Sequence, residues 1–249
     1  MRILSSPILF IIVSFLANCV IQAFCTIPPS LPASKKCGES IQTKNTLQLR
    51  GGSEDGDEES SSSFEILDEK IAYSGWRTIV QRKVKMRNGK VVDFDLVGVK
   101  TGDAAVLVFA FDTKTKTATL IREYMPASHK VLWGVGAGLI EEKHGHDAYL
   151  AAQHELEEEC HLTGGEWIPL TNAATAMDKY ALTNIHAYLV LNPEPAINPK
   201  PLDDEEDIEI VPGVAIGEIM EYIANGEMNL VGGWGCMLAI SKLRELNLI

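Results

Sequence analysis

Hydrophobic and β-branched positions divide the first half of the chain into short runs separated by polar turns. Residues 76–86 and 91–96 are two such runs, and Asn88-Gly89 lies between them, which is the strongest short signal for a β-hairpin. Residues 104–111 and 118–124 form a second pair, separated by a turn rich in Lys and Thr. We therefore expect two antiparallel strand pairs in this region.

A central helix is the clearest element of the second half. Asp147 is a suitable N-cap, and residues 148–160 contain no Gly, no Pro and no β-branched residue. We expect the helix to end before Gly164-Gly165, because glycine terminates helices.

Shorter elements are expected on both sides of this helix. They are strands at residues 131–133, 185–191 and 208–211, a Pro-rich loop at 193–201, and helices at about 214–225 and 235–246. A strand-rich first half with one central helix and two late helices predicts an α/β sandwich on a mixed sheet.

Composition limits the class of protein. The chain has 249 residues, of which 46% are hydrophobic, so it has room for one domain with appendages and for a proper core. Its 22 basic and 34 acidic residues give a net charge of -12, which argues against a general nucleic-acid-binding surface. An anionic substrate would need a metal ion or local Arg and Lys.

The N-terminal segment is typical of targeting sequences. Arg2, an apolar run at residues 8–16 and small residues up to position 23 predict a signal peptide over 1–23, with an uncleaved anchor as the alternative. Residues 24–63 are first basic and rich in Ser, Thr and Pro, then acidic and rich in Ser, which predicts a transit peptide and a linker. The junction Ala23-Phe24-Cys25 resembles the bipartite presequence of algae whose plastid lies inside the endomembrane system. That resemblance implies a mature plastid protein that is free of the membrane; the secretory pathway is the alternative.

Removal of the presequence would leave only Cys160 and Cys236. Two cysteines do not make a disulfide framework, although one bridge stays open, so we expect a reducing compartment. The remaining chain divides into an N-terminal β subdomain at 64–100 and a main domain at 101–249.

Acidic residues crowd the predicted central helix in the run Glu155-Leu156-Glu157-Glu158-Glu159. At helical spacing, Glu155, Glu158 and Glu159 fall within an arc of roughly one third of the circumference. Like charges this close repel unless a cation lies among them, and carboxylate oxygens favour Mg²⁺, Mn²⁺ or Ca²⁺. A solvated acidic helix face is the alternative.

The segment Ala137-Gly138-Leu139-Ile140-Glu141-Glu142 and this acidic helix together resemble the Nudix box. The pattern of that family is Gly, five residues, Glu, seven residues, then Arg-Glu-aliphatic-any-Glu-Glu-any-Gly-aliphatic. The resemblance covers about residue 71 to the C-terminus, and within the family it is similar to the ADP-ribose and nucleoside-diphosphate-sugar pyrophosphatases. It implies a Nudix-type α/β/α sandwich with an N-terminal antiparallel β-hairpin subdomain, and a homodimer that packs through this subdomain.

The chain departs from the family pattern in four places. Two extra residues, about Lys143-His144, precede the helix, and His146 stands where the first Glu is expected. His154 replaces the Arg, and His161 replaces the final Gly. The family's Arg pairs with a helix carboxylate, and histidine can do so only partly, because it lacks the guanidinium fork and is largely neutral near pH 7.

The resemblance implies metal-dependent hydrolysis of the diphosphate linkage of an X-linked nucleoside diphosphate. ADP-ribose or an ADP-sugar would give AMP and a sugar phosphate. In this scheme Glu155 and Glu159 bind Mg²⁺ or Mn²⁺ with the Ala137 carbonyl oxygen, while Glu158 shares a second ion and is catalytic.

Other site residues follow from the same resemblance. Glu206, in the acidic loop 202–209, is the candidate general base, with a solvated loop as the alternative. Arg122, at the end of a predicted strand, could clamp a phosphate. Trp76 and Phe94 are candidates to stack on the adenine base, with a place in the core or an interface as the alternative.

Three other functions compete with hydrolysis as interpretations of these residues. The five His and Cys residues from 144 to 161 lack the paired spacing of zinc sites. The glycines of Gly134-Val135-Gly136-Ala137-Gly138 lack the third glycine of a dinucleotide fingerprint. A Nudix-like domain that binds a nucleotide without cleaving it stays open, because the three His replacements favour it and the Glu triad opposes it.

Overall fold

The computed structural model describes residues 63–100, 102, 104–202 and 207–249. The predicted signal peptide, and the predicted transit peptide and linker up to residue 62, lie outside the described residues, as does Glu206. In the described part of the chain, no helix is both long and apolar enough to cross a membrane.

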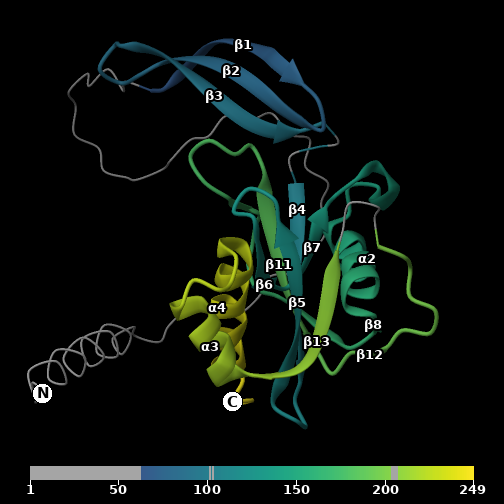
Figure 1. The fold of residues 1–249 in the computed structure, drawn as a ribbon. Coiled ribbons are helices and arrows are strands. Elements are labelled where there is room, and N and C mark those ends of the chain that lie inside the picture. Colours follow the sequence, from purple (N-terminus) through teal and green to yellow (C-terminus); the bar gives the residue numbers. More distant parts are fainter. Residues whose placement is uncertain (1–62, 101, 103, 203–206) are drawn as a thin grey trace, which may run out of the picture. The chain divides into compact units, whose positions relative to one another are not determined.

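A three-stranded antiparallel sheet in the order β1-β2-β3 begins the described chain (Figure 1). Its strands are β1 (Glu65–Ser74), β2 (Arg77–Lys85) and β3 (Val91–Val99). The predicted hairpin is confirmed as β2 and β3, and Gly89 turns it with a φ of 78°, which glycine adopts readily. The prediction missed β1, because bulges between Ile66 and Asp68 and between Ile71 and Tyr73 interrupt its apolar and polar alternation.

A mixed sheet forms the centre of the main domain, as predicted. Its strands are β4 (Ala104–Asp112), β5 (Thr117–Met125), β6 (Lys130–Gly134), β7 (Gly136–Leu139), β9 (Glu166–Pro169), β10 (Thr175–Ala176), β11 (Asn184–Leu191) and β13 (Ile208–Ala215). β11 runs parallel to β4, whereas β5 and β13 run antiparallel to their neighbours. β4 and β5 pair only near the turn that joins them, and farther along β6 pairs with β5 while β7 pairs with β4. The segment that contains β6 and β7 therefore lies between β4 and β5.

Helices cover both faces of this sheet (Figure 1). α2 (Ala148–Cys160) lies on one face, and α3 (Ile216–Ala224) and α4 (Leu230–Glu245) lie on the other. β4 explains the layering, because its alternate residues enter two separate cores: Val106 and Val108 pack with α2, whereas Leu107 and Phe109 pack with α4. An uninterrupted apolar run is typical of a strand buried on both faces. This is the α/β sandwich on a mixed sheet that the sequence predicts.

Two free cysteines lie in these two cores. Cys160 packs in the α2 core and Cys236 in the α4 core, so the sheet separates them and no bridge joins them. Burial raises the pKa of both thiols to about 12, which makes them poor nucleophiles at neutral pH.

α2 begins and ends where its sequence predicts. The Asp147 side chain accepts hydrogen bonds from the backbone N–H groups of Tyr149 and Leu150, at 2.9 and 3.3 Å. His161 closes the helix in the left-handed region, with a φ of 55°. The family pattern has glycine here, which adopts this conformation without steric cost. A short 3-10 helix, η1 (Glu142–His144), precedes α2, and a small sheet of β8 (Leu162–Thr163) and β12 (Glu194–Pro195) follows it.

The two late helices start elsewhere than predicted. Val214 and Ala215 continue β13, where they pair with β5 after a bulge, so α3 begins only at Ile216. α4 begins at Leu230, five residues before the predicted start, with Asn229 as its N-cap. Its first turns are rich in glycine, which lowers helix propensity and hides the start. The glycines serve packing: a Cβ on Gly235 would lie 2.5 Å from Leu107 Cδ1.

Candidate active site

Two glutamates of α2 are buried against the backbone of β7. Glu155 is 7% exposed and Glu159 is 3% exposed, and the two lie one turn apart on the same face of the helix. Glu159 Oε2 accepts a hydrogen bond of 2.7 Å from the backbone N–H of Ala137. A Cβ added to Gly138 would overlap the Glu155 carboxylate. Glycine at 138 therefore leaves the space that this carboxylate occupies.

The Ala137 carbonyl points toward the same place. β7 pairs with β4 along one edge, in a register that aligns Ala137 with Leu107. The Ala137 N–H turns away from β4, toward Glu159, and in an extended strand the N–H and C=O of one residue share an edge. The carbonyl oxygen thus lies on the edge of β7 that faces Glu159. The family resemblance implies that this oxygen is a third ligand of the ion.

Glu158 has a different partner. Its Oε1 lies 3.4 Å from Lys200 Nζ, and its side chain is only 18% exposed. Lys200 belongs to the Pro-rich loop, and nothing in its spacing from α2 could have identified it in advance. Among the described residues, no three His, Cys, Asp or Glu side chains are grouped so that they could hold a metal ion. Of the three carboxylates expected to converge, Glu155 and Glu159 meet at β7, whereas Glu158 pairs with Lys200.

Two histidines, one of them buried, are in contact between η1 and α2. His144 is 1% exposed, its Nδ1 accepts the backbone N–H of Glu141 at 3.0 Å, and its ring meets the His154 ring edge to face at 5.0 Å between centroids. His154, which stands at the place of the family's Arg, therefore contacts an imidazole. Neither His144 Nε2 nor His154 Nδ1 has a hydrogen-bond partner within the described part of the chain.

The prediction placed the wrong histidine at the first motif position. His146 is exposed, with a φ of 64°, whereas His144 points inward. His144 is also the sixth residue after Gly138, which is the family's uninterrupted spacing. The extra residues therefore follow His144 rather than include it: Gly145 and His146 both adopt left-handed conformations and bulge outward before Asp147. Spacing alone could not locate the insertion.

Burial makes His144 a source of acid sensitivity. Desolvation, with the nearby His154 and Lys143, lowers the pKa of His144 below 6.5 despite the opposing charges of Glu141 and Glu158. Between its lowered pKa and 6.5, the unfolded chain binds more protons than the folded chain, so the free energy of unfolding falls as pH drops through this range. We expect His144→Asn, which keeps an acceptor for the Glu141 N–H, to flatten this dependence in urea unfolding at pH 5 to 8.

The matched control for that experiment is His146→Asn, on the same loop but exposed. It should leave the pH dependence as it is in the unmodified chain. An equal effect of the two substitutions would contradict the assignment to His144.

Arg122 lies on the other face of the sheet from α2. Its neighbour Ile121 packs in the α2 core, and alternation along β5 turns Arg122 the opposite way. There its guanidinium lies 5.4 Å from the Trp133 ring centroid, Trp133 stacks on Tyr222 of α3, and Arg122 Nη1 pairs with Glu209 at 3.0 Å. The structure thus does not bring Arg122 together with the carboxylates.

The two aromatic candidates lie in the N-terminal sheet. Trp76 is exposed in the turn between β1 and β2. Phe94 lies half-buried in β3, with Lys179 Nζ 5.7 Å from its ring centroid. Neither is among the residues at β7.

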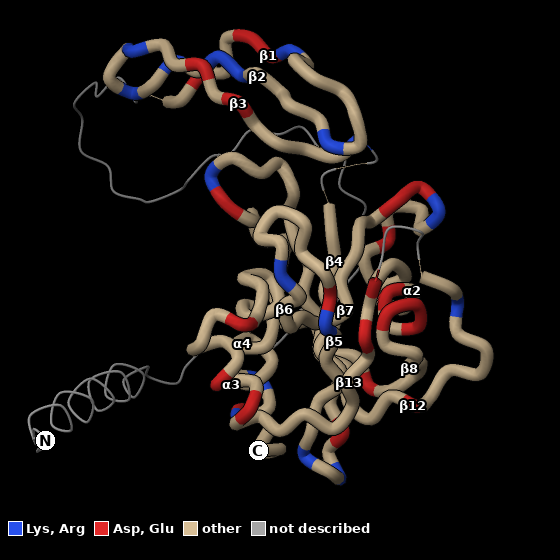
Figure 2. The backbone as a smooth tube through the Cα atoms, viewed as in Figure 1, with Lys and Arg blue, Asp and Glu red and all other residues tan. Residues whose placement is uncertain are grey.

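Charge is distributed in keeping with this arrangement. Figure 2 shows acidic residues gathered along α2, while the three-stranded sheet carries both signs. The acidic run that identified α2 in the sequence therefore lies on the α2 face of the main sheet. Two of its carboxylates are turned inward to β7.

Comparison with known proteins supports the fold. No family model matches the sequence, and no curated protein sequence matches it either. Among solved structures, the chain is similar to the crystal structure of an ADP compounds hydrolase, with a TM-score of 0.61 and 19% sequence identity. The match covers 75% of this chain and 97% of that chain. At this identity the likeness establishes the architecture: a Nudix-type mixed α/β sandwich preceded by an antiparallel sheet.

Proposed function

We propose that this protein hydrolyses the diphosphate linkage of an ADP compound, ADP-ribose or an ADP-sugar, to AMP and a sugar phosphate. The proposal rests on one observation about α2 and β7. The Glu155 carboxylate lies against Gly138, and the Glu159 carboxylate accepts a hydrogen bond from the Ala137 N–H. These are the residues at which the chain resembles the Nudix box, and they occur in a fold shared with an ADP compounds hydrolase.

The donor set at β7 fits Mg²⁺ or Mn²⁺. Glu155, Glu159 and the Ala137 carbonyl would hold the ion, and Glu158 would join them or share a second ion. Hard divalent cations favour such oxygen ligands. When bound, the ion neutralises diphosphate oxygens and makes a neighbouring water more acidic.

The residues of the chain would divide the remaining work. A water oxygen attacks one phosphorus, the bridging P–O bond breaks, and the bridging oxygen leaves with the other phosphate. The proton of the attacking water passes to a carboxylate, for which Glu206 remains our candidate. Because Glu155 and Glu159 are buried against β7, an ion held by them would lie at this strand, and the diphosphate would lie beside the ion.

A second candidate function is nucleotide binding without hydrolysis. The observation that favours it is the contact of His154 with His144, in place of the Arg-to-carboxylate pairing of the family. Under that proposal the carboxylates hold an ion and a nucleotide but turnover is absent.

Product analysis separates the two functions. The full chain is incubated with Mg²⁺ or Mn²⁺ and ADP-ribose, ADP-glucose and a broader nucleotide panel, and AMP and sugar phosphate are measured. Release of AMP from an ADP compound supports the hydrolase. Tight nucleotide binding with no product from any compound would replace it by the binding function.

We also propose a homodimer that packs through the three-stranded sheet. Ile66 faces Val84, and Ile71 faces Val80, so the two isoleucines lie on one face of the sheet, together with the Glu69–Arg82 ion pair, and Ile71 is 67% exposed. Exposed apolar residues gathered on one face favour a partner, and a second copy satisfies the family resemblance. The proposed place of work is a plastid, reached through the presequence.

Ile71→Lys is expected to shift the chain from dimer to monomer, because it puts a charge into the apolar contact. Light scattering after size-exclusion chromatography measures the mass. Lys70→Ala, at the adjacent position on the opposite face, should leave the dimer intact. A dimer that survives Ile71→Lys unchanged would exclude this face.

A further inference from the structure

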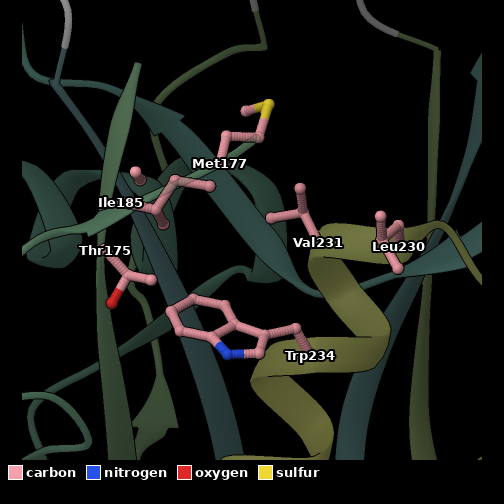
Figure 3. Close-up of a pocket in the computed structure, with 7 residues that line it drawn as sticks. Thr175, Met177, Ile185, Leu230, Val231 and Trp234 are labelled. Carbon is pink, nitrogen blue, oxygen red and sulfur yellow. The ribbon is translucent and has the colours of Figure 1, made fainter. Parts of the chain in front are cut away.

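An apolar slot opens between β10, β11 and the start of α4. Met177 and Ile185 form one wall, Leu230, Val231 and Trp234 form the other, and Thr175 lies at the rim. Figure 3 shows the indole of Trp234 extending from α4 toward Thr175 and Ile185. The slot encloses about 210 Å³. Its flank is unusually apolar for a surface, since Leu230 is 85% exposed.

The slot continues toward the candidate active site. A second cavity shares Met177, Ile185 and Val231 with it and reaches Ala137, Gly138 and Leu139 of β7. Gly138 is the residue on which the Glu155 carboxylate rests. The second cavity lies at one end of the sheet, where β7 ends and β4 and β11 begin, so a molecule whose diphosphate lies at β7 would reach the slot over that end of the sheet.

The lining selects the part of a nucleotide that the slot can hold. Thr175 and the indole N–H of Trp234 supply the only polar side-chain groups among the lining residues, so most hydroxyls of a sugar would lose water without gaining partners. A flat base keeps its polar edge toward the opening and stacks its face on the indole. The volume is below the roughly 300–1,000 Å³ of pockets for drug-sized ligands, so it suits one ring system rather than a whole nucleotide.

We infer that this slot binds the nucleobase of the substrate, with Trp234 as the stacking residue, while the diphosphate lies along Ala137 to Leu139. The inference rests on the proposed function for the position of the diphosphate. It moves the base-binding role from Trp76 and Phe94 of the N-terminal sheet to α4.

The test uses AMP as the probe, with the full chain in the absence of divalent metal. AMP and ribose 5-phosphate are titrated by tryptophan fluorescence and calorimetry. Trp234→Leu is expected to weaken AMP binding about 5- to 100-fold and to leave ribose 5-phosphate binding unchanged, since base stacking on an aromatic ring contributes affinity of this order. In ADP-ribose hydrolysis the same variant should raise KM with little change in kcat.

A second variant guards against loss of folding. Thr175 is exposed at the rim, and Thr175→Phe fills the slot without opening the core. It should weaken AMP binding as Trp234→Leu does, whereas Trp76→Leu should not.

The outcomes separate this inference from the proposed function. If AMP binding depends on Trp234 but the chain hydrolyses none of the compounds, base binding in the slot is supported and the hydrolase function is overturned. Hydrolysis with AMP affinity and KM unchanged in both slot variants would overturn the slot and leave the enzyme standing. Loss of AMP binding in Trp76→Leu alone, or no AMP binding by the unmodified chain, would also overturn the slot.

Discussion

Gly138→Ala is expected to abolish hydrolysis of the ADP compound while lowering the free energy of unfolding by no more than about 1–3 kcal/mol. The added methyl group overlaps the Glu155 carboxylate, which is the mobile end of a long side chain. That end can swing away at modest cost in stability. Once moved, it no longer lies at β7, so the ion loses a ligand and the diphosphate loses its counter-charge.

Urea unfolding and product release under saturating Mg²⁺ measure the two effects separately. Gly217→Ala is the matched control, because Gly217 lies in the first turn of α3 with nothing within 4 Å of an added Cβ. There alanine should raise helix stability by up to about 1 kcal/mol and leave hydrolysis unchanged. Full activity in Gly138→Ala would show that hydrolysis does not need the Glu155 carboxylate to lie against β7 at Gly138.

Glu158→Gln is expected to lower kcat/KM at least about 100-fold and to leave the fold intact. A metal ligand or catalytic carboxylate contributes several kcal/mol to the transition state, and each 1.4 kcal/mol is about tenfold in rate. The partly exposed pair with Lys200, by contrast, contributes roughly 0–1 kcal/mol to stability. Hydrolysis kinetics and circular dichroism measure the two effects.

Glu157→Gln provides the comparison within the same acidic run. Glu157 lies on the opposite side of α2 from Glu155, so its substitution removes the same charge without reaching β7. If Glu157→Gln slowed hydrolysis as much as Glu158→Gln, the effect would come from the general charge of the helix rather than from a ligand position.

The sequence predicts most accurately where local chemistry decides the structure. α2 is correct at both ends because Asp147 caps it and no helix-breaking residue lies within it. β4 is correct because a strand buried on both faces needs only an apolar run. β1 and the start of α4 were missed for the opposite reason. The bulges of β1 and the glycines of α4 are determined by packing against neighbouring elements, and they weaken the strand alternation and the helix propensity of their own segments.

The candidate site shows the same division. Glu155 and Glu159 follow from helical spacing and Ala137 from the family resemblance, and the fold brings the three together. Alternation shows that Ile121 and Arg122 point to opposite faces but not which face carries α2, so the position of Arg122 could not be read from the sequence. Lys200 comes from a distant loop, and its contact with Glu158 depends on tertiary structure.

The pairing of Glu158 with Lys200 would couple ion binding to the loop that follows β12. Glu159 is held by the β7 backbone, whereas Glu158 pairs with Lys200 through Oε1, so an ion bound by Glu158 would compete with the lysine for that carboxylate. Such coupling is reciprocal. If loss of the Lys200 contact raises the affinity for the ion by some factor, ion binding weakens the Glu158–Lys200 contact by the same factor. Lys200 precedes the acidic loop that contains Glu206 by only a few residues. The Lys200 ammonium group would therefore be an internal competitor of a metal ion at Glu158, supplied by a loop far from α2 in the sequence.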